Sequence, residues 1–267
     1  MPLSDDEFIR YSRQILLPEV GEFGQEALKK SKVLIVGVGG LGQLAAQYLA
    51  AAGVGQLILV DDDKVERSNL PRQLLFDDKD IGEYKSVRAR DNLVQRYRDC
   101  EIHGIVRRLS LDNASDLIAQ ADIVLDCSDN LETRHHVNQT CVNLDTPLVT
   151  ASVAYFSGFM LAVDLKKATS AGCYACLFPQ DTQVVQTCST AGVLGPMVGV
   201  VASMQTLMAM NLLLDVGSMC GKLLRFNGSE FKWHEAKLSR DPKCHVCEGV
   251  INALALATNN EVCHAQC

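Results

Sequence analysis

The feature that most constrains the fold is a glycine-rich turn between a predicted buried strand and a predicted helix. Segment 32–38 (KVLIVGV) is continuously apolar, as a buried strand is, and the Ala- and Leu-rich segment 41–52 is typical of a helix. Between them, Gly37, Gly39 and Gly42 form a G-x-G-x-x-G motif with a further glycine at Gly40. Glycines permit a tight turn and the close approach of a nucleotide, and a helix N-terminus favours negative charge. The motif predicts nucleotide binding, and alone it would suggest NAD.

The rest of the chain alternates strand-like and helix-like segments. Further strands are predicted at 56–61, 102–107, 122–127 and 147–152, and later, antiparallel ones at 158–165 and within 222–237. We therefore expect an α/β fold with a doubly wound (Rossmann-like), mainly parallel sheet and C-terminal antiparallel strands. Ser4 and Glu7 have capping-box spacing, which predicts a helix to about Ile15. We expect one domain over 1–250, with a nucleotide-binding core at about 30–155, a C-terminal portion at 156–250 and a tail at 251–267.

Composition excludes several classes of protein. The net charge is −7, whereas a general nucleic-acid binder or a protein of anionic membrane surfaces needs basic patches. The N-terminal segment is charged and lacks the apolar core of a secretory signal. The apolar stretch 193–214 is interrupted by polar residues, Gly and Pro, so we interpret it as a buried helix and not as a membrane span. Most of the 11 cysteines are scattered, unlike a disulfide framework, which favours a cytoplasmic location.

The chain after the second predicted strand carries residues suited to phosphate. Asp61 ends that strand 19 positions after the last motif glycine, where a carboxylate can accept hydrogen bonds from ribose hydroxyls. Residues 68–73 (SNLPRQ) and Lys85 follow. A dehydrogenase has no use for Asn69, Arg72 and Lys85 at one end of its site, whereas attack on a triphosphate needs such groups to stabilise charge on the departing pyrophosphate. The alternative is a solvated loop with ordinary surface charges. A P-loop motif is absent from the sequence.

A second polar segment, 126–130 (DCSDN), follows another predicted strand. Ligand-binding residues gather at the carboxyl ends of strands in doubly wound sheets. Magnesium binds through one or two carboxylates together with phosphate oxygens, and we assign that role to Asp129. The alternative is that Asp129 caps the helix predicted to begin at Leu131, and the two roles are compatible.

Two CxxC pairs predict a metal site. Cys173 and Cys176 are separated from Cys244 and Cys247 by 67 intervening residues. Four thiolates with no nearby histidine or open position suit a closed structural zinc. A redox dithiol is the alternative, but neither pair lies in a thioredoxin-like context. We expect zinc to fix the C-terminal strands to the nucleotide-binding core. Cys263 and Cys267 in the tail could bind metal, although a frayed end with stray thiols is the simpler interpretation.

Several motifs together resemble one family. They are RYSRQ at 10–14, GVGGLG at 37–42, DDD at 61–63, SNLPRQ at 68–73, Lys85, and DCSDN at 126–130. The combination resembles the ubiquitin-activating-enzyme-like adenylyltransferases, and more narrowly the bacterial ThiF/MoeB/HesA group, from about Ser4 to Cys247. The sequence departs from the family at Pro71, where glutamine is usual. We expect this change to be tolerated because Asn69 and Arg72 are kept.

The resemblance implies a reaction and its residues. ATP and Mg²⁺ would be used to adenylylate the C-terminal carboxylate of a small β-grasp (ubiquitin-like) sulfur carrier that ends in Gly-Gly, and a sulfur donor protein would then form a thiocarboxylate. Six residues match the family's ATP and magnesium positions, namely Gly40, Asp61, Asn69, Arg72, Lys85 and Asp129. We expect their neighbours Gly37, Gly39, Gly42, Asp63, Ser68 and Asn130 to complete the site. The family also carries zinc at positions matching the four paired cysteines.

Two further residues gain a role only through the resemblance. Arg13 matches an arginine that reaches the nucleotide of the neighbouring subunit, which implies a homodimer; by spacing alone it is an exposed helix residue. Cys188 lies in the polar segment 181–191 and matches the family's candidate nucleophile. A loop thiol of lowered pKa near an acyl-adenylate could attack it or receive sulfur. The alternative is an inert thiol in a lid, and in the molybdopterin branch the matching cysteine is dispensable.

The carrier is the least determined part of this expectation. Residues 190–196 (TAGVLGP) look closer to the thiazole-forming branch of thiamin biosynthesis, which we favour, whereas the N-terminal half resembles the molybdopterin branch at least as much. Two other classes stay open. An NAD-dependent oxidoreductase would leave SNLPRQ and Lys85 without a role, and a non-catalytic zinc scaffold would not need the ATP-contact residues.

Overall fold

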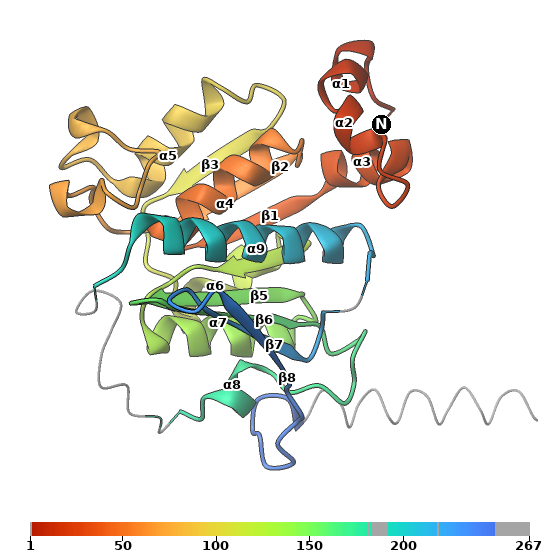
Figure 1. The fold of residues 1–267 in the computed structure, drawn as a ribbon, viewed down its shortest axis with the longest axis vertical. Coiled ribbons are helices and arrows are strands. Elements are labelled where there is room, and N and C mark those ends of the chain that lie inside the picture. The colour runs from red at the N-terminus through yellow and green to blue at the C-terminus, as the bar shows by residue number, and fades with distance from the viewer. Residues whose placement is uncertain (1, 181, 183–191, 218, 249–267) are drawn as a thin grey trace, which may run out of the picture.

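The computed structural model describes residues 2–180, 182, 192–217 and 219–248. At its centre lies an eight-stranded sheet in the order β3-β2-β1-β4-β5-β6-β7-β8 (Figure 1). The strands from β3 to β5 in that order are parallel, and β6, β7 and β8 extend the sheet in antiparallel fashion. The predicted fold class, a doubly wound α/β sheet with C-terminal antiparallel strands, is confirmed.

The parallel strands are short apolar segments. They are β1 (Lys32–Val36), β2 (Gln56–Val60), β3 (Glu101–Ile105), β4 (Ile123–Asp126) and β5 (Leu148–Ala154), each within two residues of its predicted bounds. In β1, β2 and β4 nearly every residue is buried, because helices cover both faces of the sheet. The strand order reverses between β1 and β4, which is where open α/β sheets bind their ligands.

The antiparallel strands are neighbours in the sheet, but only β5–β6 and β7–β8 are joined by short connections, because α8 and α9 lie between β6 and β7 in the chain. β5 turns into β6 (Ser157–Val163) through Tyr155, whose φ of 53° lies in the left-handed region. The predicted segment 222–237 contains a hairpin, β7 (Lys222–Asn227) and β8 (Lys232–Lys237). All six residues of β8 are exposed, and β8 forms the edge of the sheet.

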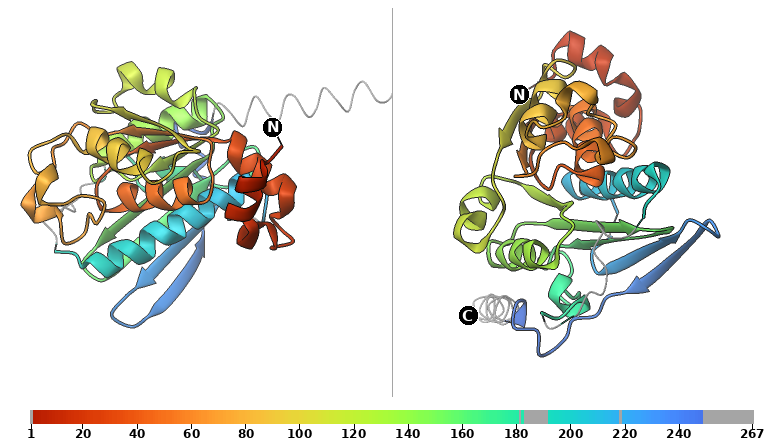
Figure 2. Two further views of the ribbon diagram at one scale, coloured as in Figure 1. Left: turned by 90° about the horizontal axis from the view of Figure 1, so that it is seen from above. Right: turned by 90° about the vertical axis from the view of Figure 1, so that its left-hand side faces the viewer.

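Two layers of helices sandwich the parallel strands (Figure 2). One face carries α4 (Gly40–Ala51), α5 (Lys85–Val94) and α9 (Gly195–Leu213), and the other carries α6 (Leu111–Ile118) and α7 (Leu131–Asn143). Alternate residues of β1 point to the two faces: Val33 and Ile35 pack with the first layer, and Leu34 and Val36 with the second. The short helix α8 (Tyr174–Leu177) packs beside α7.

Helix α9 accounts for the long apolar stretch near the C-terminal third. Among the described helices, α9 is the one whose length and apolarity would allow it to cross a membrane. It packs across β4, β5 and β6, and its Gln205 Nε2 donates to the carbonyl oxygens of Asp126 and Val149, both at 3.0 Å. The prediction of a buried helix is confirmed, because its apolar residues join the core beneath the sheet.

The N-terminal segment forms three short helices, α1 (Asp5–Arg10), α2 (Ser12–Ile15) and α3 (Gly21–Lys30). The capping box of Ser4 and Glu7 is present, as predicted. The expectation of one continuous helix to Ile15 was wrong, because the helix is interrupted at Tyr11. The Tyr11 ring is buried against Gly53, where a Cβ atom would lie 2.6 Å from it, so tertiary packing sets the break.

Candidate active site

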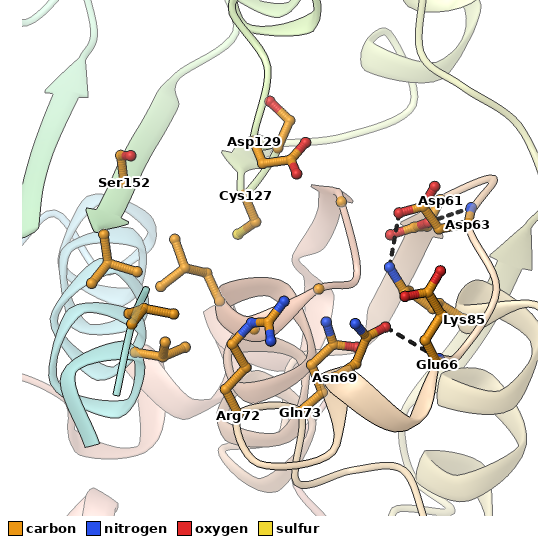
Figure 3. Close-up of a pocket in the computed structure, with 18 of the residues that line it drawn as sticks. Asp61, Asp63, Glu66, Asn69, Arg72, Gln73, Lys85, Cys127, Asp129 and Ser152 are labelled. Atoms are coloured by element: carbon orange, nitrogen blue, oxygen red, sulfur yellow. Dashed lines mark hydrogen bonds and ion pairs between the residues drawn. The ribbon is translucent and has the colours of Figure 1, made fainter. Parts of the chain in front are cut away.

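A cavity of about 390 Å³ opens at the carboxyl ends of the central parallel strands (Figure 3). Its lining comes from the turn after β1, the loops after β2 and β4, the end of β5 and the N-terminal turn of α9. Ten of the twelve residues predicted for the nucleotide site line it: Gly37, Gly39, Gly40, Asp61, Asp63, Ser68, Asn69, Arg72, Lys85 and Asp129. The two that do not are Gly42 and Asn130. Residues scattered over 93 positions of sequence are thus gathered into one site.

The glycine turn is shaped by close packing as well as by its opening to the cavity. Gly37 has a φ of +87°, and a Cβ atom there would lie 2.8 Å from the carbonyl oxygen of Cys127. Gly42 lies inside α4, where a Cβ atom would collide with the Gly37 carbonyl oxygen. Gly42 therefore permits the helix to pack on the strand and does not face a ligand. Around Gly39 the nearest atom to a Cβ would be 3.7 Å away, so this part of the turn stays open.

Asp61 closes one end of the cavity and is held from two sides. Its Oδ2 accepts from the backbone N–H of Val38 at 2.6 Å, and its Oδ1 accepts from that of Asp63 at 2.7 Å. Burial raises the pKa of Asp61 to about 6, although the Lys85 charge and these two N–H groups act in the opposite direction. A carboxylate after the second strand, fixed against the glycine turn, is placed to accept hydrogen bonds from ribose hydroxyls.

Lys85 supplies a buried positive charge beside Asp61. It begins α5, its side chain is only 8% exposed, and its Nζ pairs with Asp63 Oδ2 at 2.8 Å. The backbone N–H of Lys85 also donates to the Asp63 carbonyl oxygen at 2.9 Å. Asp63 therefore holds Lys85 at the cavity wall by two contacts, one to the backbone N–H and one to the ammonium group.

A 3₁₀ turn, η1 (Arg67–Asn69), presents the SNLPRQ segment to the cavity. Asn69 is buried, and its Oδ1 accepts from the Glu66 backbone N–H at 3.2 Å. Arg72 donates from Nη1 to the Ser68 carbonyl oxygen at 2.9 Å and, within the described residues, makes no ion pair. Its guanidinium group points into the cavity (Figure 3), so a positive charge without a carboxylate partner faces the ligand space.

Pro71 is compatible with this turn. The N–H groups of Arg72 and Gln73 supply its hydrogen bonds by donating to the Asn69 carbonyl oxygen, both at 3.0 Å. The proline ring is exposed, and the turn does not use a donor at position 71.

The DCSDN segment divides its polar groups between the cavity and the protein interior. Asp129 is exposed and lines the cavity, and within the described residues its carboxylate makes no hydrogen bond or ion pair. The cap of α7 is Asn130, whose Oδ1 accepts from the Thr133 backbone N–H at 2.9 Å. The alternative role of Asp129 as a helix cap was wrong. The expected contact of Asn130 with the nucleotide is also not supported, because its side-chain oxygen is used in the helix and lies outside the cavity lining.

Sequence reasoning missed part of the lining. Gln73 is 3% exposed, and its Oε1 has no hydrogen-bond partner within the described residues, as expected of a group that awaits a ligand. Its place in SNLPRQ was a signal that could have found it. Arg134, Ser152 and Val153 also line the cavity. An arginine in the first turns of a helix looks like a surface residue in sequence, so its burial could not be foreseen.

The four paired cysteines converge beneath α7. The Sγ–Sγ distances are 4.0 Å for Cys173–Cys176, 3.7 Å for Cys173–Cys244 and 3.6 Å for Cys176–Cys247. All four sulfur atoms lie within 4.8 Å of one another, and three of the four residues are buried. Thiolates around a tetrahedral zinc ion, with Zn–S bonds of about 2.3 Å, are about 3.8 Å apart, so the cluster has the dimensions of such a site. The remaining described cysteines are also free.

The other predicted residues are not part of the described cavity lining. Arg13 is an exposed residue of α2 and does not line the cavity. Cys188 and the tail cysteines Cys263 and Cys267 fall outside the described residues.

A doubly wound sheet whose glycine turn, fixed carboxylate and cationic loop meet in one cavity is the architecture of a nucleotide-binding α/β enzyme. The family model of the ThiF family matches residues 11–246, and the chain belongs to that family. The family predicted from the motifs is thereby confirmed.

Individual relatives agree with this assignment. The chain is 44% identical over 247 residues to the sulfur carrier protein ThiS adenylyltransferase of Escherichia coli, covering 92% of this chain and 98% of that protein. It is 43% identical over 249 residues to the adenylyltransferase and sulfurtransferase MOCS3 of Drosophila ananassae, of which it spans 54%. Among solved structures, E. coli MccB with ATP matches with a TM-score of 0.77 at 25% identity, over 89% of this chain and 74% of that one. The protein is accordingly an adenylyltransferase.

Proposed function

We propose that this adenylyltransferase uses ATP to activate the C-terminal glycine carboxylate of a small ubiquitin-like sulfur carrier of the ThiS kind. The carboxylate oxygen attacks the α-phosphorus, the bond from that phosphorus to the bridging oxygen breaks, and pyrophosphate leaves. The product is a carrier–AMP anhydride. A general base is not required, because the attacking carboxylate is already ionised at neutral pH.

The observation that carries the proposal is the meeting of two cations, Arg72 and Lys85, in the same cavity as Asp61. Asp61 would orient the ribose. Arg72 can fork onto two phosphate oxygens, and Lys85 acts as a point charge beside them. Both would stabilise charge that grows on the departing pyrophosphate. The related E. coli protein MccB has been solved with ATP, which supports the same nucleotide here.

Asp129 is the residue that would hold magnesium. Its exposed carboxylate faces the cavity, and Mg²⁺ characteristically takes one or two carboxylates and completes its shell with phosphate oxygens and water. Such an ion, when bound, neutralises charge on the triphosphate.

The cysteine cluster would hold zinc, as a closed structural site. Cys173 caps α8 and Cys176 lies within it, whereas Cys244 and Cys247 follow the last strand. A shared ion would therefore fix the end of the antiparallel strands to the layer that contains α7. None of the four cysteines lines the cavity, so we assign the cluster no role in the reaction.

Identity of the carrier rests on the relatives. The E. coli ThiS adenylyltransferase matches over 98% of its length, whereas MOCS3 is about twice as long as the match. We therefore favour a ThiS-like carrier of thiamin thiazole biosynthesis. A molybdopterin-synthase carrier is the second candidate, because the MOCS3 identity of 43% is nearly as high.

We propose a homodimer in which Arg13 reaches the nucleotide of the partner. Around Arg13, the N-terminal helices expose apolar side chains, including Ile9 (72%), Leu16 (70%) and Phe23 (90%). Such a surface is what a subunit interface covers. We further propose that a sulfur donor protein acts on the adenylate. Cys188 is the candidate thiol that attacks the adenylate or receives the sulfur. We also propose that the protein works in a reducing cytoplasm.

The test is exchange of labelled pyrophosphate into ATP with each carrier supplied separately. Carrier-dependent exchange is expected, with the thiazole carrier preferred. Arg72→Ala should lower the exchange rate at least about 100-fold, since it removes a charge that acts on the transition state. Arg67→Ala is the matched control, because Arg67 lies in the same turn but pairs with Asp78 at 3.4 Å, outside the cavity lining. Exchange with neither carrier, or undiminished exchange in Arg72→Ala, contradicts the proposal.

A further inference from the structure

Behind the cavity, Asp126 turns its carboxylate into the protein. Asp126 is 1% exposed, and both its oxygens are engaged. Oδ1 accepts from the backbone N–H of Ser128 at 3.0 Å and from its hydroxyl at 2.6 Å. Oδ2 accepts from the Thr150 hydroxyl at 2.7 Å. The Asp126 carboxylate therefore makes its hydrogen bonds inside the protein, whereas the Asp129 carboxylate, three positions later, faces the cavity.

A buried arginine faces the same group from α7. Arg134 is 5% exposed, and its Nη2 donates to the carbonyl oxygens of Ser128 and, at 2.9 Å, of Ala151. Its Nη1 donates to the Thr150 hydroxyl at 3.4 Å. The Thr150 hydroxyl thus donates to Asp126 and accepts from Arg134, so it links the two opposite charges. Buried charges are costly unless they are compensated, and here hydrogen bonds engage both groups and join them through the Thr150 hydroxyl.

The network hydrogen-bonds every polar atom of Ser128, the residue that precedes Asp129. The N–H and hydroxyl of Ser128 bind Asp126, and its carbonyl oxygen binds Arg134. On the other side, Asn130 is fixed as the cap of α7. Asp129 is the one residue between these two fixed points, and its own carboxylate has no partner within the described residues. Its backbone is consequently fixed while its side chain is left for a ligand.

We propose that Asp126, Thr150 and Arg134 are positioning residues that hold the Asp129 carboxylate in place for a divalent cation. The inference rests on the proposed function, in which Asp129 is the magnesium residue. The charges of Asp126 and Arg134 cancel, so these residues contribute no net charge to the site. They fix the geometry of the loop, and Asp129 supplies the negative charge. Loss of a partner that orients a metal-binding residue commonly weakens metal affinity about 10- to 100-fold.

The test is Thr150→Val, which keeps the shape of the side chain and removes the hydroxyl that joins Asp126 to Arg134. Thr150→Ser restores the hydroxyl and should restore the wild-type behaviour. The matched control is Thr206→Val, because Thr206 is equally buried but its hydroxyl bonds only to Ala202 within α9. Arg134→Lys is a second variant that keeps the charge but loses the guanidinium group, which reaches Thr150 through Nη1 and the two carbonyl oxygens through Nη2.

Binding is measured with Mn²⁺, titrated by electron paramagnetic resonance into each protein with α,β-methylene-ATP present. We expect Thr150→Val and Arg134→Lys to raise the Mn²⁺ dissociation constant about 10-fold or more, with Thr150→Ser and Thr206→Val near wild type. Unchanged Mn²⁺ affinity in both network variants overturns the inference, and so does an equal loss in Thr206→Val, which would signify general destabilisation. Thermal unfolding shows which variants are folded.

The pyrophosphate exchange of the wild type separates this inference from the proposed function. If the wild type exchanges with neither carrier, the proposed substrate is wrong, yet the Mn²⁺ titration still decides whether the network positions Asp129. If the wild type exchanges and the two network variants match it in both Mn²⁺ affinity and magnesium dependence of exchange, the positioning role alone is wrong.

Discussion

Lowering the pH from about 7.5 to about 5.5 should weaken binding of adenosine about fourfold through protonation of Asp61. Burial raises the pKa of Asp61 to about 6, so the carboxylate is almost fully ionised at the higher pH and only about one quarter ionised at the lower. Two of its lone pairs are already used by the N–H groups of Val38 and Asp63. Only the ionised form keeps enough acceptor capacity for the ribose hydroxyls as well.

Adenosine is the appropriate ligand because it carries both ribose hydroxyls and lacks phosphate groups, whose own titration would obscure that of the protein. Dissociation constants are measured by isothermal titration calorimetry at several pH values. Asp61→Asn is the control, since an amide cannot titrate and should give weak binding that does not change with pH. A flat profile for the wild type, or the same slope in Asp61→Asn, refutes the assigned role of Asp61.

The same pKa makes a prediction about stability, with a defined sign. A carboxyl group whose pKa is raised by folding stabilises the protein below its unfolded value, and that contribution is lost as the pH rises through the folded value. The rise from an ordinary 3.8 to about 6 corresponds to about 3 kcal/mol, at about 1.4 kcal/mol for each factor of ten. Relative to the wild type, Asp61→Asn should therefore gain up to about 3 kcal/mol between about pH 4 and pH 7, measured by urea unfolding. A difference that does not change with pH contradicts the raised pKa.

Two further substitutions test the packing and the cysteine cluster. Gly42→Ala should destabilise the protein by about 3 kcal/mol or prevent folding, because the new Cβ atom would collide with the Gly37 carbonyl oxygen. Gly199→Ala is the control: a Cβ atom there has nothing within 4 Å, so the change should be neutral or stabilise the helix by about 1 kcal/mol. Denaturant unfolding compares them, and equal stability would refute the packing argument. Cys247→Ser should lower the zinc content measured by mass spectrometry and the Tm, while Cys220→Ser, outside the cluster, should leave both unchanged; a Cys247→Ser protein that keeps its zinc would contradict the assigned site.

The parallel half of the sheet could be predicted because its strands are buried on both faces. A segment such as 32–36 is then almost entirely apolar, and the Ala- and Leu-rich segment that follows is recognisable as a helix. The break in the first helix could not be predicted in the same way. It depends on the fit of the Tyr11 ring against Gly53, residues brought together only by the tertiary fold.

The site shows the same division. Polar residues in a fixed order after an apolar strand have few structural uses, so the sequence alone could indicate Asp61, Asn69, Arg72 and Lys85 as site residues. By contrast, DCSDN offers two carboxylates, and nothing in the sequence tells which turns inward. That choice is made by Arg134 and Thr150, which come from other elements and bind Asp126 in the interior.

The position of α9 in the chain has a consequence for synthesis of the protein. The strands β1 to β5 are complete at residue 154, but the helix that covers β4 and β5 on one face ends only at residue 213. About 60 residues must be added in between, which takes about 3–12 s on the ribosome. During that interval Val149 and Ala151 lack their cover, and the backbone carbonyl oxygens of Asp126 and Val149 lack the Gln205 amide. The nascent chain therefore presents an apolar sheet surface of the kind that chaperones bind, until α9 emerges and closes it.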